Sequence, residues 1–195
     1  MRPDHLLMVS LPENEVRLIE RARGGDFESF SALYSCYLDA IYRYIFYRTG
    51  NAQDAEDITG SVFLKAWEAL PHYKQMGCSF IHWLYRIAHN SIVDYHRHLK
   101  VADHEPLEPD ALLPDLAQED ALDGVISNEE AASLAGAIAA LPDEYQQFIT
   151  LRFIEGMSHA EISLITGKSE VACRGMQHRA LTSLNRMLSV MKEGN

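Results

Sequence analysis

Apolar residues recur at three- and four-residue steps along most of the chain, and this spacing places side chains on one face of an α-helix. Similar stripes run through residues 27–49, 51–70 and 79–100. The apolar positions of the last stripe are Phe80, Trp83, Leu84, Ile87, Ala88, Ile92 and Val93. The pattern therefore predicts an all-α fold built from amphipathic helices.

Residues that begin and end helices bound these stripes. Gly50 ends one stripe, and Asn51 with Asp54 three residues later is typical of a capped helix start. A shorter helix is predicted for residues 14–24. Another is predicted to begin at the proline and acids near residue 142 and to end near Gly156.

The helical pattern stops between residues 101 and 130. Three prolines interrupt a run of acidic residues there. A segment of this composition cannot bury enough apolar surface to become ordered by itself. We therefore expect a linker over residues 101–130 between two small helical domains, residues 14–100 and residues 131–190.

The net charge of −11 is concentrated in this linker. Residues 1–100 contain 12 acidic and 11 basic residues, residues 101–130 contain 10 acidic and no basic residues, and residues 131–195 contain 6 of each. Both flanking segments are nearly neutral, so each can carry a local basic face. The acidic linker is either a tether that keeps the domains apart or an imitation of nucleic acid.

A helix-turn-helix is predicted near the C-terminus. Ser158 and Glu161 form a capping box for a short helix that Gly167 closes, and Ser169 caps the next helix. In such a motif the second helix enters the major groove of DNA. The capping serine and the outward positions of this helix are the candidate DNA-binding residues Ser169, Arg174, Gln177, His178 and Arg179.

The polar side of the predicted helix over residues 79–100 carries cations, aromatic rings and an amide. Flat rings stack on exposed bases, cations follow phosphates and an amide can pair with a base edge, so this mixture suits unpaired nucleic acid. A solvated helix surface is the alternative interpretation. The candidate residues on this side are Tyr85, Arg86, His89, Asn90 and Arg97.

The sequence predicts no metal site, no cofactor and no catalytic centre. His82, His89 and His96 recur at seven-residue steps, but seven helical residues span about 10 Å, too far for one ion to be shared by all three. Glycine-rich phosphate loops, nucleophile elbows and paired catalytic carboxylates are not found in the sequence. We therefore expect a binding protein rather than an enzyme.

A cytoplasmic location is expected. No apolar run approaches the roughly 20 residues of a membrane span, and the N-terminus has no signal-peptide cleavage site. The three cysteines are widely separated and lack the paired spacing of a zinc site or a disulfide framework.

Three blocks of residues occur in an order and spacing that identify a protein family. The blocks are Asp54–Ile58 with Val62–Trp67, then Phe80–Asn90 with Asp94 and Tyr95, and finally Ala140–Pro142, Leu151–Phe153, Glu161, Ile162, Gly167 and His178–Leu181. They resemble the extracytoplasmic-function (ECF) sigma factors of bacterial RNA polymerase, over about residues 15–100 and 130–190. The resemblance implies two helical domains, the family's regions two and four, that carry RNA polymerase core to a promoter.

The resemblance also implies roles for individual residues and partners. The helix around residues 54–67 is similar to the surface that docks on the polymerase β′ subunit, with the candidate contacts Asp54, Glu56, Asp57 and Lys65. Asn90 and the loop over residues 74–79 match the family's minus-ten reader, so the polar side of that helix becomes the candidate minus-ten surface. The helix-turn-helix would read the minus-thirty-five element. The implied partners are the β and β′ subunits of core polymerase, promoter DNA and an anti-sigma factor.

The second helix of the helix-turn-helix departs from the family pattern. The family often has Gly-Thr-Val-Lys-Ser-Arg after the capping serine, whereas residues 170–176 here keep Arg174 as one cation and have Met176 in place of another. Binding in the major groove of DNA is still predicted. The base sequence of the minus-thirty-five element cannot be predicted from these residues. Two other functions fit the motifs: a helix-turn-helix regulator that binds a palindromic operator without polymerase, and a protein-interaction adaptor.

Overall fold

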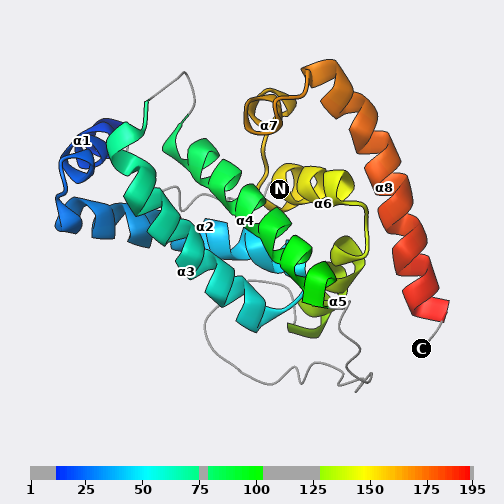
Figure 1. Ribbon diagram of the computed structural model, residues 1–195. Helices are drawn as coiled ribbons and strands as arrows, with labels where there is room; N and C mark the ends of the chain where they lie inside the picture. The colour runs from blue at the N-terminus through cyan, green and yellow to red at the C-terminus, as the bar shows by residue number, and fades with distance from the viewer. Residues whose placement is uncertain (1–11, 75–78, 103–127, 194–195) are drawn as a thin grey trace.

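The computed structural model describes residues 12–74, 79–102 and 128–193, and every regular element within them is helical (Figure 1). The N-terminal half consists of α1 (Pro12–Arg23), α2 (Phe27–Thr49), α3 (Ala52–Ala69), the 3₁₀ turn η1 (Leu70–His72) and α4 (Phe80–Ala102). The C-terminal half consists of α5 (Asn128–Ala139), α6 (Asp143–Ile149), the π-helical segment η2 (Thr150–Ile154), α7 (His159–Thr166) and α8 (Glu170–Glu193). The predicted all-α fold is confirmed.

The predicted linker lies mostly outside the described residues. Its first two residues, 101–102, belong to α4, and its last three, 128–130, belong to α5. The helical stretches therefore extend further into the acidic segment than the sequence pattern indicates. Residues 103–127 and the predicted loop positions 75–78 are not among the described residues.

Helix α2 is the centre of the N-terminal half, because it contacts α1, α3 and α4. The predicted stripes supply its core, with Leu33 and Ile41 of α2, Val62 of α3 and Leu84 of α4 fully or almost fully buried. Gly50 ends α2 in the left-handed conformation at φ 71°, where glycine is favoured because it lacks a Cβ. The predicted cap of α3 is confirmed.

The C-terminal half contains the predicted helix-turn-helix. Ser158 and Glu161 form the predicted capping box of α7, and Gly167 ends this helix at φ 71°. The single helix expected up to Gly156 is instead interrupted by the π-helical turn, in which the Glu155 amide donates to the Thr150 carbonyl at 2.9 Å. The Thr150 hydroxyl bonds the Gln146 carbonyl at 2.8 Å and so competes with the regular backbone bonds.

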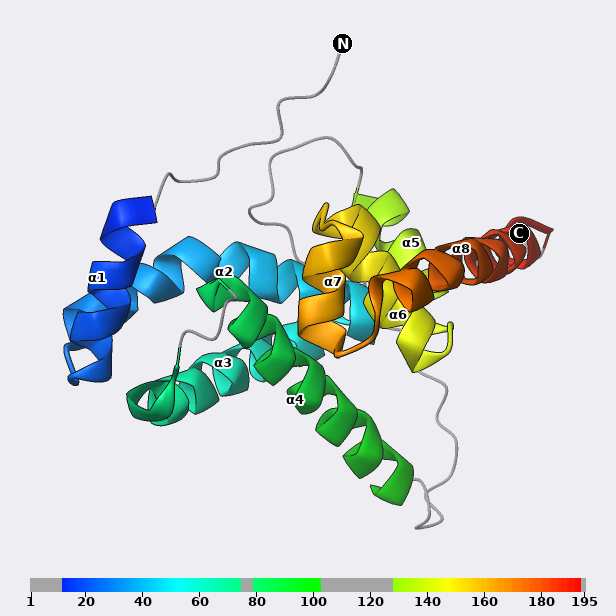
Figure 2. The ribbon, with the colours of Figure 1, turned by 90° about the horizontal axis from the view of Figure 1, so that it is seen from above.

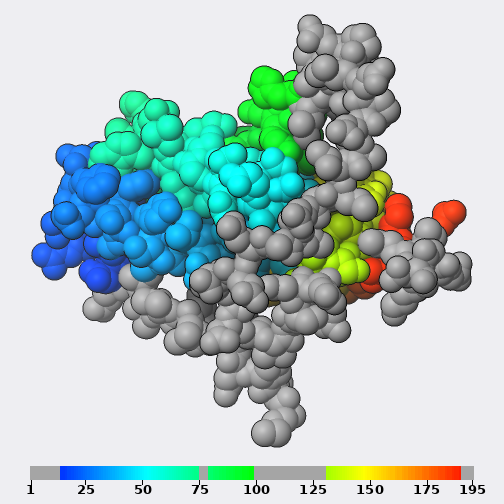
Figure 3. All heavy atoms as spheres, turned by 90° about the horizontal axis from the view of Figure 1, so that it is seen from below, coloured from blue at the N-terminus to red at the C-terminus, as the bar shows by residue number. Residues whose placement is uncertain are grey.

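The two halves pack against each other (Figure 2). Helix α5 lies along α2, and α7 lies against α4. The space-filling view from below shows α5 beside the side chains of the N-terminal half (Figure 3). Small residues allow this approach, because a Cβ on Gly50 would lie 3.4 Å from the Ala139 Cβ. One continuous cluster of buried apolar residues therefore includes members of both halves.

A buried carboxylate of the C-terminal half joins two helices of the N-terminal half. Glu155, with a side chain 4% exposed, accepts two bonds from the Arg43 guanidinium of α2, at 2.9 and 2.8 Å. The Tyr85 hydroxyl of α4 donates a third bond to it at 2.8 Å. Burial and the Glu155 charge raise the pKa of Tyr85, so this phenol remains a donor. The π-helical turn ends at this residue, which explains why its side chain reaches the N-terminal half.

A buried guanidinium makes the second polar contact between the halves. The Arg48 side chain of α2 is fully buried, and it donates to Asp143 at the start of α6 and to the Tyr44 hydroxyl at 2.9 Å. Its Nη1 lies 3.0 Å from the His89 Nδ1 of α4. Nearby, His82 Nε2 lies 3.8 Å from a Glu161 carboxylate oxygen. Polar side chains of both halves therefore meet along the faces of α2 and α4.

Leu84 provides a test of the core. It is fully buried, and Leu84→Ala should lower the free energy of unfolding by about 2–5 kcal/mol because a cavity remains. The matched control is Leu64→Ala, since Leu64 is 59% exposed on α3 and should change stability by less than about 0.5 kcal/mol. Urea unfolding followed by circular dichroism measures both, and equal losses would contradict the assigned core.

The contact between the halves should weaken in mild acid. Burial lowers the pKa of His82, opposed in part by Glu161. Burial and the Arg48 charge lower the pKa of His89, opposed in part by Asp143. Below the ordinary value of 6.5, the unfolded chain binds protons that these buried rings do not, so stability falls as the pH falls. Above about pH 7 both rings are neutral in both states, and this contribution is constant.

Urea unfolding at pH 7.5 and pH 5.5 measures this dependence. The native chain should lose stability over this range, and a chain carrying His82→Gln and His89→Gln should lose less. An equal loss in both chains would show that these two rings do not cause it.

Candidate nucleic-acid interface

The second helix of the helix-turn-helix presents most of its predicted DNA-binding residues to solvent. The Ser169 hydroxyl caps α8 by accepting from the Ala172 amide at 3.2 Å. Arg174, His178 and Arg179 are exposed, and Arg174 lies 3.4 Å from Glu170 one turn earlier. The opposite face packs on the C-terminal half through the buried residues Cys173, Met176 and Ala180.

Two residues of α8 differ from the expected arrangement. Gln177 is half-buried, and its Oε1 lies 2.9 Å from His159 Nε2 of α7, so its amide is partly engaged inside the motif. Val171, in the first turn of α8, is an apolar residue that is 77% exposed. An exposed apolar group there can contact a thymine methyl group.

The structure divides the predicted minus-ten residues of α4 into two groups. Arg86, Asn90 and Arg97 are exposed, and Arg97 pairs with Asp94 at 3.1 Å. Tyr85 is only 1% exposed, because it donates to Glu155 of the C-terminal half, and His89 is half-buried beside Arg48 of α2. In this arrangement Tyr85 and His89 are therefore covered, and their predicted contact with minus-ten DNA stays a prediction.

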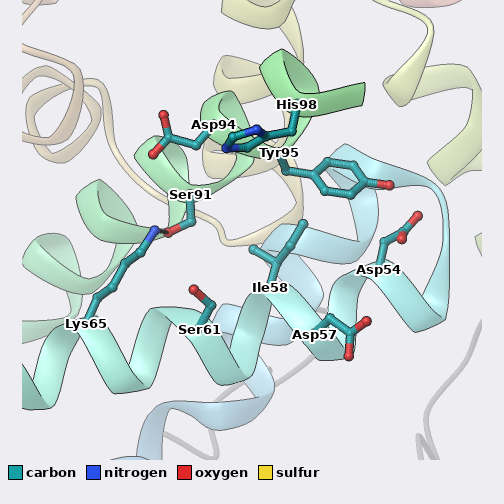
Figure 4. A pocket seen from close by; sticks show the side chains of 9 residues that line it. All are labelled: Asp54, Asp57, Ile58, Ser61, Lys65, Ser91, Asp94, Tyr95 and His98. Carbon is teal, nitrogen blue, oxygen red and sulfur yellow. Dashed lines mark hydrogen bonds between the residues drawn. The ribbon is translucent and has the colours of Figure 1, made fainter. Parts of the chain in front are cut away.

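A groove of about 380 Å³ separates α3 from α4 and contains three of the four predicted polymerase-binding residues (Figure 4). Asp54, Asp57 and Lys65 line it, and the Lys65 ammonium donates to the Ser91 hydroxyl at 2.9 Å. Glu56 is exposed but does not line the groove.

The far wall of the groove comes from residues that were not predicted as site residues. These are Ser91, Asp94, Tyr95 and His98 of α4. Burial and a hydrogen bond to Asp54 raise the pKa of the Tyr95 phenol. One signal for this wall was present in the sequence, because Asp94 and Tyr95 belong to the residue pattern that resembles the family. The groove carries more acidic than basic groups, so it suits a basic surface of a protein partner.

The residues that the structure describes contain no group of three or more His, Cys, Asp or Glu side chains arranged to hold a metal ion. Over the same residues, no helix is long and apolar enough to cross a membrane.

Family models match both helical halves. The model of sigma-70 region 2 matches residues 33–101, and the model of sigma-70 region 4 matches residues 131–184, together more than half of the chain. The second match includes α7 and α8 as far as residue 184, and the groove between α3 and α4 lies within the first match.

Curated proteins show the same relationship over most of the chain. The ECF RNA polymerase sigma factor BldN of Streptomyces coelicolor is 36% identical over 177 residues, which are 89% of this chain and 65% of that protein. The chain therefore spans slightly less than two thirds of BldN. The ECF RNA polymerase sigma factor SigW of Bacillus subtilis is 29% identical over 184 residues, which are 87% of this chain and 94% of that protein.

Two solved structures share the fold. CnrH in complex with the cytosolic domain of CnrY matches with a TM-score of 0.67 and 23% identity, over 90% of this chain and 97% of that chain. The sigma factor RpoE in complex with the anti-sigma factor NepR, from Bartonella quintana, matches with a TM-score of 0.62 and 22% identity, over 84% of this chain and 98% of that chain. With both halves matched in order by sigma-70 models and most of its length related to ECF proteins, the chain belongs to the ECF family of RNA polymerase sigma factors.

Proposed function

We propose that this chain binds RNA polymerase core in the cytoplasm and directs it to promoters, without a cofactor or a catalytic step of its own. The observation that carries the proposal is that one sigma-family chain exposes two different polar helix faces, one on α8 and one on α4. One face, on α8, has the geometry of a duplex reader. The other, on α4, combines an exposed amide with exposed cations, which suits an opened strand.

In this proposal residues 14–100 act as region two and residues 131–190 as region four. The groove between α3 and α4 receives a basic surface of the polymerase β′ subunit, and its three carboxylates, Asp54, Asp57 and Asp94, provide the complementary charge. An anti-sigma factor holds the chain away from polymerase until a signal releases it. Support comes from family membership and from RpoE, whose solved complex contains an anti-sigma factor.

A run-off transcription assay with purified core polymerase tests the proposal directly. The chain should bind core and initiate at specific promoters. A chain that shifts duplex DNA alone and never initiates would instead be an operator-binding regulator. A chain that does neither would be an adaptor.

Arg174 and His178 are predicted to read the minus-thirty-five duplex, because both are exposed near the start of α8. A good side-chain contact to a base contributes about 1–3 kcal/mol of discrimination. Arg174→Ala or His178→Ala should therefore relax promoter preference at one or two positions of a randomised library. Arg186→Ala is the matched control, since Arg186 is also exposed but lies more than two turns further along α8 than His178. If both variants keep the promoter-sequence preference of the native chain, Arg174 and His178 do not read bases.

Asn90 is predicted to act during strand opening rather than in polymerase binding. Its amide is exposed on α4, one residue after His89 and one turn after Arg86. Permanganate footprinting of holoenzyme with Asn90→Ala should show loss of reactive thymines at the minus-ten element, while core affinity is retained. Asn185→Ala, an exposed asparagine on α8, is the control. Lost core binding would assign Asn90 to the polymerase contact instead.

A further inference from the structure

The packed arrangement of the two halves is too compact to span a promoter. Helix α4 contacts α7, and α7 contacts α8. Packed helices lie about 8–10 Å apart, so the start of α8 is roughly 20 Å from α4. Elements at minus ten and minus thirty-five are about 25 base pairs apart, which is roughly 85 Å at about 3.4 Å per base pair. If α4 and α8 read these two elements, the halves must separate first.

Opposite charges face each other where the halves would separate. The N-terminal half contributes the guanidinium groups of Arg43 and Arg48, and the C-terminal half contributes the carboxylates of Glu155 and Asp143. Both arginines lie beside predicted minus-ten residues. Arg43 shares Glu155 with Tyr85, and Arg48 lies 3.0 Å from His89.

We infer that Arg43 and Arg48 form an anion-binding face of the N-terminal half, which Glu155 and Asp143 occupy while the chain is closed and which phosphates of the promoter strand occupy once it opens. The inference rests on the proposed function, because it requires promoter DNA as the second ligand. In the closed chain the two carboxylates stand where phosphate oxygens will bind.

The geometry of the arginines fits both ligands. Arg43 holds Glu155 through two parallel bonds, at 2.9 and 2.8 Å, and this fork geometry matches a phosphate as well as a carboxylate. Arg48 has a donor to spare, because its buried Nε has no hydrogen-bond partner among the described residues. An unpaired buried donor is costly, so the closed arrangement does not fully satisfy this face.

The contact is also suited to reversal. Removing the charges of Arg43 and Glu155 from water costs free energy that their attraction offsets only in part, so this pair adds little net stability to the closed state. The neighbouring seam between α2 and α5 is built from small residues, including Gly50, Ala135 and Ala139. Binding of DNA or polymerase to the open form can therefore shift the population from closed to open chains. The apparent affinity of the whole population is lower than that of the open form, because only the open fraction binds.

Variants on the two sides of the contact should have the same effect on closure and opposite effects on DNA binding. Glu155→Gln and Arg43→Gln each break the pair, so both should increase the radius of gyration measured by small-angle X-ray scattering of the full chain. The control is Glu144→Gln, because Glu144 pairs with Lys168 within the C-terminal half at 2.9 Å and should leave the radius unchanged. Circular dichroism checks that each variant keeps its helices.

Fluorescence anisotropy with a single-stranded minus-ten oligonucleotide gives the deciding measurement. Glu155→Gln should bind at least threefold more tightly than the native chain, since the arginines are uncovered. Arg43→Gln should bind at least threefold more weakly, with a salt slope reduced by roughly 0.7 for each lost phosphate contact. The charge-swapped chain, Arg43→Glu with Glu155→Arg, should close again yet bind the oligonucleotide weakly.

Two results would overturn the inference. An unchanged radius in both single variants would show that the ion pair does not hold the halves together. Tighter oligonucleotide binding by both variants would show that Arg43 only closes the chain and does not contact phosphate. Failure of the native holoenzyme to initiate at any promoter would instead contradict the proposed function, and the scattering result would still decide whether the pair controls closure.

Discussion

The buried carboxylate of Glu155 is the constraint on which the arrangement of the two halves depends. A buried charge must be paired and hydrogen-bonded, because its transfer from water is otherwise too costly. Arg43 and Tyr85 meet this requirement from two different helices of the N-terminal half. Their three bonds determine where the end of η2 lies relative to α2 and α4, and α7 and α8 follow from that position because they are packed onto the same half.

The contact made by Glu155 determines which surfaces are exposed when the two halves are packed together. Arg86 and Asn90 are exposed on the outer side of α4. Tyr85 is covered, because its hydroxyl donates to Glu155. The exposed side of α8 and the groove between α3 and α4 are not covered by the contact. A closed chain can therefore present the groove between α3 and α4 and the outer side of α8 while part of the polar side of α4 is still covered.

Local signals predicted the helices, whereas the contact between the halves required information that no local pattern contains. The cap at Asn51, the capping box at Ser158 and the helix ends at Gly50 and Gly167 depend on neighbours a few residues away, so sequence alone predicted them. Arg43 and Glu155 are 112 positions apart. One available signal was missed: Arg48 follows Tyr44 by four residues and Ile41 by seven, which places a charge within the apolar stripe of α2 and indicates a buried partner.

The polar character of the contact has a consequence for the open chain. A large apolar interface would leave an exposed hydrophobic patch whenever the halves separated, and such patches promote aggregation. Separation here uncovers guanidinium, carboxylate and imidazole groups, which water solvates well, beside members of the apolar cluster that the two halves share. The same charges that pair in the closed state are therefore solvated in the open state and offset part of the cost of exposing the shared apolar residues. An ionic contact suits a chain whose halves must be joined in one state and lie tens of ångströms apart in another.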